Sequence, residues 1–77
     1  GRKMQVFTDQ PGLQLYTANF LDGSLNGKSG KPYLKRSSLC LETQHYPDSV
    51  NHPGFPSAIV RPESPFRSTT SFTFSTR

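Results

Sequence analysis

The carboxylate of Glu42 is the side chain of this sequence whose surroundings most suggest acid–base chemistry. It is the only Glu among the first 62 residues, and it lies near the end of the run 38–44, in which Leu39 and Leu41 alternate with smaller or polar residues. This alternation predicts a short strand with Glu42 on the face opposite the leucines. A carboxylate between apolar neighbours is costly to bury unless it is paired or used. Glu42 therefore lies either on a solvated strand face or in a functional site.

Three other side chains could bind a metal or act as nucleophiles, namely Cys40, His45 and His52. Their spacing does not match a zinc site, and three ligands in a loop-like stretch are too few to close one. No His stands at a recognisable spacing from Cys40, so we expect this thiol to be a small buried apolar residue. The sequence thus predicts no metal site.

A nucleotide-binding loop is suggested by Gly27-Lys28-Ser29, but the surrounding residues exclude it. The phosphate-binding motif needs a Gly five residues before its second Gly, and Asp22 occupies that place. A helix should follow the motif, whereas Gly30 and Pro32 come next.

Length and composition permit one small domain with a modest core. The chain has 77 residues, of which 31% are hydrophobic, and its single Cys excludes an internal disulfide. The net charge is +4, and the basic residues are scattered rather than gathered in one helix. A nucleic-acid-binding peptide is therefore an alternative that these charges do not favour. No apolar run approaches the roughly 20 residues of a membrane span, and we expect neither a nucleic-acid nor a membrane partner.

The hydrophobic pattern predicts an all-β chain. Alternation indicates strands at residues 3–8, 13–20, 35–43 and 68–75, with a brief strand at 58–60. Residues 9–12 predict a turn, and the Gly-rich residues 22–31 predict a flexible excursion between two strands. The Pro-rich residues 44–65 exclude helix and favour a long loop packed over a core.

Two long segments resemble the aldose 1-epimerase (galactose mutarotase) family. Residues 10–23, QPGLQLYTANFLDG, are similar to its T-x-Q-P-G-x-Q-F-Y-T-G-N-F-L-D-G segment, with Ala18 in place of a common Gly. Residues 39–51, LCLETQHYPDSVN, are similar to its F-C-L-E-T-Q-x-x-P-D-x-x-N segment. Residues 55–57, 61–62 and 67–70 follow the family's closing pattern, although residues 63–65 depart from it. The resemblance covers essentially the whole chain.

The resemblance implies the C-terminal part of a large antiparallel β-sandwich of galactose-mutarotase-like type, so residues 1–77 would be a C-terminal fragment of a single aldose 1-epimerase domain. It implies interconversion of the α and β anomers of aldohexoses such as galactose and glucose, with Glu42 as the general base. It implies that Gln14 binds the sugar substrate, since an amide both donates and accepts hydrogen bonds; the alternative is that Gln14 ties down a neighbouring strand. One base and one acid suffice for this reaction, so no metal or organic cofactor is expected.

The same resemblance limits what these 77 residues can do. The family's catalytic acid is a His upstream of anything present here, so we do not assign that role to His45 or His52. Asn19 and Asp22 match motif positions but are expected to fix a turn. We expect the fragment alone to be inactive and to need the missing N-terminal portion. The alternatives are a non-catalytic carbohydrate-binding relative and a truncated remnant. A cytoplasmic location is expected, and the lone Cys is compatible with it.

Overall fold

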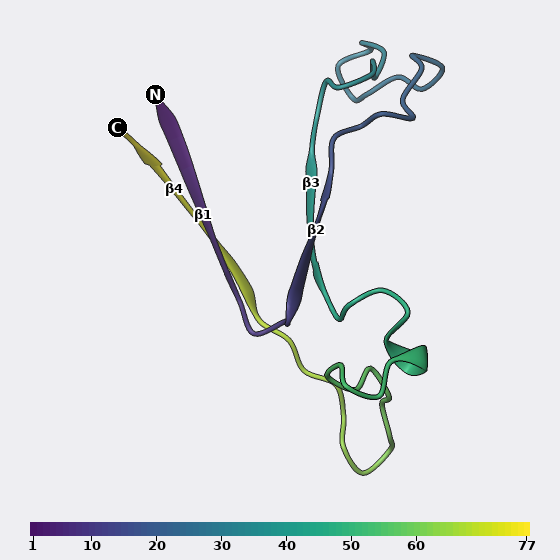
Figure 1. Ribbon diagram of the computed structural model, residues 1–77. Helices are drawn as coiled ribbons and strands as arrows, with labels where there is room; N and C mark the ends of the chain where they lie inside the picture. The colour runs from purple at the N-terminus through teal and green to yellow at the C-terminus, as the bar shows by residue number, and fades with distance from the viewer. The chain divides into compact units, whose positions relative to one another are not determined.

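Antiparallel strands form almost all of the regular structure, as the sequence predicts. The computed structural model describes residues 1–77, and its elements are β1 (Arg2–Thr8), β2 (Gly12–Tyr16), β3 (Cys40–Gln44), the 3₁₀ turn η1 (Ser49–Asn51) and β4 (Thr70–Thr76) (Figure 1). β1 pairs with β4, and β2 pairs with β3. The chain divides into two compact units, which are described separately: a first unit of Gly1–Gly12 with Thr43–Arg77, and a second unit of Leu13–Glu42.

The first unit is built on the antiparallel pair β1–β4. Its register places Met4 opposite Phe74 and Val6 opposite Phe72. Because side chains alternate between the faces of a strand, these four lie on one face, and the other face carries mostly Lys, Gln, Ser and Thr. One face of the sheet is therefore apolar at its centre and polar at its two ends, and the other face is largely polar apart from Phe7.

Polar side chains hold one end of this sheet together. The carboxylate of Asp9, just after β1, accepts the Thr69 backbone N–H at 3.0 and 3.1 Å and the Ser68 hydroxyl at 3.1 Å. The hydroxyl of Thr70 lies 3.1 Å from that of Thr8 and 2.8 Å from that of Thr43. Side chains from β1, β4 and the end of β3 thus meet at Thr70.

The Pro-rich segment has less core contact than the sequence led us to expect. It contains only the short turn η1, and no strand forms at residues 58–60. Tyr46 and Phe55 pack edge to face at 5.1 Å, and His52 stacks on Phe55 at 4.7 Å. Val50, in contrast, is 77% exposed. The prediction that this segment packs over a core is therefore wrong for this chain. The aromatic residues of the segment pack mainly on one another.

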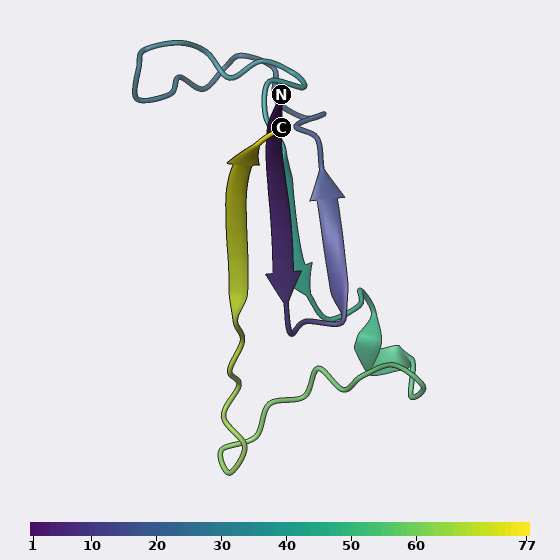
Figure 2. The same ribbon diagram turned by 90° about the vertical axis from the view of Figure 1, so that its left-hand side faces the viewer.

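β2 and β3, most of whose residues belong to the second unit, run in opposite directions, as Figure 2 shows. Both strands are shorter than predicted. β2 ends at Tyr16, because Ala18 adopts a left-handed backbone conformation with φ 56°. β3 begins only at Cys40, because Arg36 has φ 61° and the Ser37 N–H bonds the Leu34 carbonyl in a turn.

The Gly-rich excursion between β2 and β3 folds back on itself, whereas the sequence suggested a flexible loop. Backbone hydrogen bonds join Gly23 to Tyr33, Tyr33 to Leu25 and Gly27 to Lys31 at 2.8–2.9 Å. At Gly27 an added Cβ would lie 2.8 Å from the Tyr33 hydroxyl, so the Tyr33 side chain would have to shift to admit a larger residue. The excursion thus has a defined internal structure.

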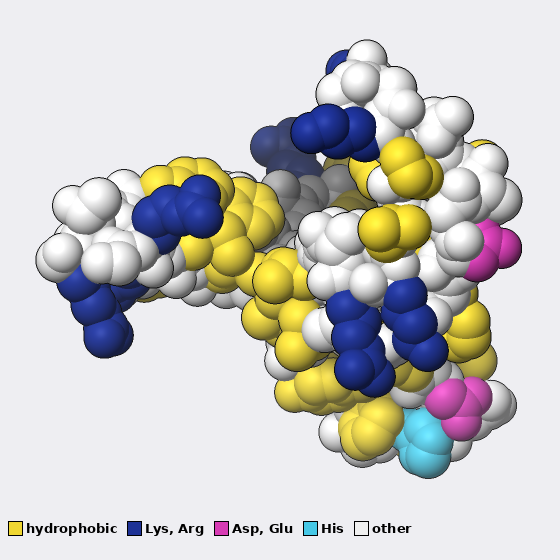
Figure 3. All heavy atoms as spheres, turned by 90° about the horizontal axis from the view of Figure 1, so that it is seen from above, with side chains coloured by type: hydrophobic (Ala, Val, Ile, Leu, Met, Phe, Trp, Pro, Cys, Tyr) yellow, Lys and Arg dark blue, Asp and Glu magenta, His cyan; other side chains and the backbone are white.

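Neither unit encloses a hydrophobic core. Ala18, at 1% exposure, is the only buried residue of the chain. Large apolar side chains are exposed throughout, including Phe20 at 89% and Phe74 at 73%, and many hydrophobic atoms reach the face drawn in Figure 3. Isolated two-stranded sheets are marginally stable in water. The apolar surface of these strands therefore requires a cover that the 77 residues do not supply. None of the helical structure in the chain is long and apolar enough to cross a membrane.

Candidate functional site

The two predicted site residues lie on paired strands. Gln14 is the middle residue of β2 (Gly12–Tyr16), and Glu42 is the middle residue of β3 (Cys40–Gln44). Both side chains are exposed. A carboxylate can take up a proton, and an amide can both donate and accept hydrogen bonds. The sheet thus carries one possible base and one possible polar binding group within a single pair of strands.

The Glu42 side chain is exposed to solvent on β3. Glu42 is exposed, while Thr43 and Gln44 beyond it are partly covered. The hydroxyl of Thr43 bonds that of Thr70, which fixes the residue that follows Glu42 in the sequence. These residues hold the backbone of this part of β3, and no part of the chain desolvates the Glu42 carboxylate to the level of a buried group.

The prediction that Cys40 is buried is wrong. We expected a buried thiol, but Cys40 is exposed. The alternation around it predicts the strand correctly, yet the sheet formed by β2 and β3 has only two strands and nothing in this chain covers that position. A strand pattern indicates which residues share a face, and burial additionally needs a partner for that face.

Two motif residues, Asn19 and Asp22, make hydrogen bonds within the excursion. The Asn19 amide donates to the Thr17 hydroxyl at 3.1 Å, and its oxygen accepts from the Arg36 Nε at 3.3 Å. The Asp22 carboxylate accepts the Ser24 N–H at 2.9 Å, and hydrogen bonding by Ser24 holds the pKa of Asp22 below its ordinary value. Both side chains therefore fix turns, as the sequence suggested.

The two histidines occupy different surroundings within the first unit. His52 Nε2 lies 3.1 Å from an Asp48 carboxylate oxygen, and the His52 ring stacks on Phe55. His45 packs at a tilt against Phe66, with ring centroids 6.3 Å apart. Neither contact brings a histidine into the β2–β3 strand pairing, and no group of three His, Cys, Asp or Glu side chains is gathered to hold a metal ion.

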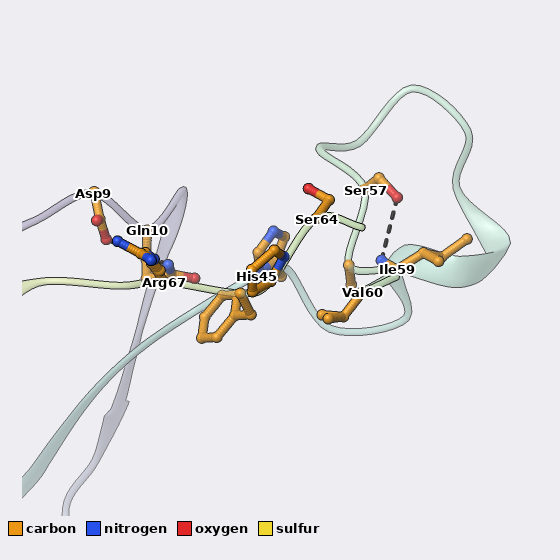
Figure 4. A pocket seen from close by; sticks show the side chains of 11 residues that line it. Asp9, Gln10, His45, Ser57, Ile59, Val60, Ser64 and Arg67 are labelled. Atoms are coloured by element: carbon orange, nitrogen blue, oxygen red, sulfur yellow. Dashed lines mark hydrogen bonds between the residues drawn. The ribbon is translucent and has the colours of Figure 1, made fainter. Parts of the chain in front are cut away.

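A hollow of about 560 Å³ lies in the first unit, between the turn after β1 and the Pro-rich segment (Figure 4). Asp9, His45 and Arg67 supply its charged or titratable groups, and the remaining lining residues are Gln10, Ser57, Ala58, Ile59, Val60, Ser64, Pro65 and Phe66. Neither Gln14 nor Glu42 lines it. This hollow and the predicted site residues thus do not coincide, because Gln14 and Glu42 lie on the β2–β3 strand pair.

This hollow was not predictable from the sequence. Asp9, His45 and Arg67 are far apart along the chain and follow no spacing rule, so only the folded loops bring them together. The Asp9 carboxylate is already engaged, because the Thr69 backbone N–H, with further hydrogen bonds from Gln10 and Ser68, holds its pKa below the ordinary value. Asp9 therefore acts as a structural acceptor rather than a free base.

Comparison with known proteins gives one consistent result. The family described as aldose 1-epimerase matches residues 1–73. Galactose mutarotase of Mus musculus is 59% identical over 75 residues, which are 97% of this chain and 22% of the relative. Galactose mutarotase of Homo sapiens is 55% identical over 97% of this chain and 22% of its own length. Aldose 1-epimerase of Escherichia coli is 36% identical over 94% of this chain and 21% of its own length. The chain spans about a fifth of the length of these relatives.

Proposed function

Because the chain belongs to the aldose 1-epimerase family, we propose that it forms the C-terminal part of an isomerase that interconverts the α and β anomers of aldohexoses such as galactose and glucose. The observation that carries this proposal is the placement of Glu42 and Gln14, the two residues assigned from the family motifs, at the centres of paired strands. The all-β, antiparallel structure is consistent with the galactose-mutarotase-like fold.

Glu42 would act as the general base. Its carboxylate takes the proton of the C1 hydroxyl, an acid protonates the ring oxygen, and the bond between C1 and the ring oxygen breaks to give the open-chain aldehyde. Rotation about the C1–C2 bond and attack of the hydroxyl on the other face of the aldehyde give the other anomer. Every proton removed is returned on ring closure, so the reaction needs no external oxidant or reductant.

Gln14 would bind the sugar. Its amide can donate one hydrogen bond to a hydroxyl of the substrate and accept another, which holds the ring in place while the base acts. The alternative, that Gln14 only ties down a neighbouring strand, predicts a loss of stability on substitution rather than an increase in KM.

The catalytic acid and most of the sugar pocket would come from outside these 77 residues. We propose that residues 1–77 are the C-terminal portion of one domain, because the chain spans 22% of the mouse relative and leaves the faces of both sheets without cover. The 77 residues alone should then show no mutarotase activity and should fold poorly. Activity of the isolated chain above the uncatalysed rate would refute this.

The base is tested by Glu42→Gln in the intact protein that contains this chain, with mutarotation followed by polarimetry. The change keeps the shape of the side chain and removes its ability to accept a proton, so kcat should fall by about 10²-fold or more. Glu63→Gln is the matched control, since Glu63 is an exposed Glu in a turn between Arg61 and Ser64, and its kcat should stay within about twofold of wild type.

Retention of full activity by Glu42→Gln would overturn the assignment of the base. An intact wild-type protein that binds galactose without turnover would instead support a carbohydrate-binding relative. We also propose a cytoplasmic location, with which the free thiol of Cys40 is compatible.

A further inference from the structure

We propose that Asn19 and Arg36 are positioning residues that set the alignment of β2 against β3, and through it the geometry of Gln14 and Glu42. The observation is a pair of contacts at the base of the excursion, that is, between residues 17–19, which follow β2, and residue 36, which precedes β3. The Arg36 backbone N–H donates to the Ala18 carbonyl at 3.1 Å, and the Arg36 Nε donates to the Asn19 side-chain oxygen at 3.3 Å. The inference rests on the proposed function, since it concerns the residues assigned there.

The contact joins two points of unusual backbone. Ala18 has φ 56° and Arg36 has φ 61°, so both residues occupy the left-handed region that non-glycine residues rarely adopt. Such conformations persist where the surrounding structure holds them. Here Ala18 is the one buried residue of the chain, and its carbonyl also accepts the Leu21 N–H at 3.4 Å. The base of the excursion is therefore held both by hydrogen bonds and by burial of Ala18.

Asn19 extends this constraint to the end of β2. Its side-chain N–H donates to the hydroxyl of Thr17, the residue directly after β2, while its oxygen accepts from Arg36. One amide thus bridges the segment that leaves β2 and the segment that leads into β3. Removing either half of the bridge leaves the backbone bond between Ala18 and Arg36 as the main contact across the base.

Alignment needs such a device because the connection is long. In a short hairpin the turn type fixes the register, and a slip of one residue would move every side chain of a strand to the opposite face. The β2–β3 connection runs from Thr17 to Leu39 and cannot fix the register in this way. A hydrogen-bonded base at residues 17–19 and 36 restricts the alignments available to the strand pair, and with them the relative placement of Gln14 and Glu42.

The test uses the intact protein with Asn19→Ala and Arg36→Lys. Asn19→Ala removes the bridge, whereas Arg36→Lys keeps the charge and the backbone but not a donor at the Nε position. At a temperature where the variants are fully folded, kcat should fall by about 10-fold to 100-fold for Asn19→Ala and by less for Arg36→Lys, since small misplacements of reacting groups have large effects on rate. Asn19→Asp keeps an oxygen for Arg36 and should recover most of the activity.

Asp22→Ala is the matched control. It removes a 2.9 Å hydrogen bond to Ser24 in the same excursion but none of the contacts at its base, so kcat per folded molecule should stay within about twofold of wild type. The double variant Asn19→Ala/Arg36→Lys should be no worse than Asn19→Ala alone, because both changes break the same contact.

The outcomes separate this inference from the proposed function. If Glu42→Gln abolishes activity while Asn19→Ala and Arg36→Lys keep kcat within twofold and change only the denaturation midpoint, the contact is merely structural and the positioning inference is wrong. If Glu42→Gln leaves activity intact, the proposed function fails whatever the other variants show. Loss of kcat in Asn19→Ala with recovery in Asn19→Asp supports the inference.

Discussion

The two strand pairs of this chain are aligned by different means. In β1–β4, every residue from Arg2 to Thr8 has a partner in Thr70–Thr76, and one face is apolar. In β2–β3 the strands are shorter, and the constraint lies beyond their ends, where Ala18 meets Arg36. The first pair is thus specified by its side-chain pattern, and the second by the backbone and side-chain hydrogen bonds among Ala18, Asn19 and Arg36 at the base of its connection.

This difference agrees with the different roles of the two pairs. A regular amphipathic pair such as β1–β4 is suited to packing its apolar face against another part of the domain, because burial of that face determines its register. The β2–β3 pair carries the candidate base and binding group, and a burial pattern alone would leave their alignment poorly fixed. We infer that structural and functional strands in this chain are held by different interactions.

The largest expected effect tests the role of the β1–β4 face. Phe72→Ala in the intact protein should lower the free energy of unfolding by about 3 kcal/mol, because the apolar face would be packed against the rest of the domain. Equilibrium denaturation measures this change. Phe72 is 47% exposed in the 77 residues, so a loss of this size requires cover from elsewhere.

Ser71→Ala is the control on the opposite face of the same strand, where Ser71 pairs with Phe7. It should change the free energy of unfolding by no more than about 0.5 kcal/mol. Equal and small effects of Phe72→Ala and Ser71→Ala would contradict the difference between the two faces, and with it the claim that the side-chain pattern specifies this pair.

The sequence predicts most of the strands because alternation is a local property. The strand expected at 68–75 appears as Thr70–Thr76, and that expected at 3–8 appears as Arg2–Thr8. Their pairing was not predictable, since no local signal relates segments at opposite ends of the chain. The predicted ends of the middle strands failed where Ala18 and Arg36 enter the left-handed region, which neither residue type favours.

In the candidate site, too, some features were predictable from the sequence and others were not. Glu42 and Gln14 were assigned through long motifs, and the structure adds their placement at the centres of paired strands. The contact between Asn19 and Arg36 joins residues whose separation along the chain follows no helical or strand period, so only the folded excursion reveals it. Burial of Cys40 was mispredicted, because burial depends on layers that a strand pattern does not contain.

A smaller effect is expected from Asp9, which ties β1 to β4. Hydrogen bonds from Thr69 lower the pKa of Asp9 in the folded state, so the charged form favours folding. This contribution is present above the unfolded-state pKa near pH 4 and is lost as the pH falls through the lower folded-state value. Asp9→Asn should therefore lower the Tm by a few degrees at pH 7.

The difference between wild type and Asp9→Asn should shrink below about pH 4. Thermal unfolding at several pH values measures it, and Asp22→Asn provides a comparison in the second unit, because Asp22 also has a lowered pKa but bonds only within its own turn. A difference that stays constant down to pH 2 would show that the charge of Asp9 does not hold this sheet end.

The smallest expected effect concerns Ala18, and it follows from opposing terms of similar size. Ala18→Gly relieves a left-handed conformation that costs an L-residue about 1–2 kcal/mol. It also loses a buried methyl group worth about 0.8 kcal/mol and adds about 0.4–1 kcal/mol of backbone entropy to the unfolded state. The free energy of unfolding of the intact protein should thus change by less than about 1 kcal/mol, as measured by chemical denaturation.

Ala18→Val separates the backbone from the packing at the same position. A β-branched residue is a rare outlier in the left-handed region, and Ala18 is buried at 1% exposure, so we expect a loss of about 2 kcal/mol or more. If Ala18→Val were as mild as Ala18→Gly, the base of the excursion would be free to rearrange. The contact between Ala18 and Arg36 could then not align β2 with β3, and the contrast between the two strand pairs would disappear.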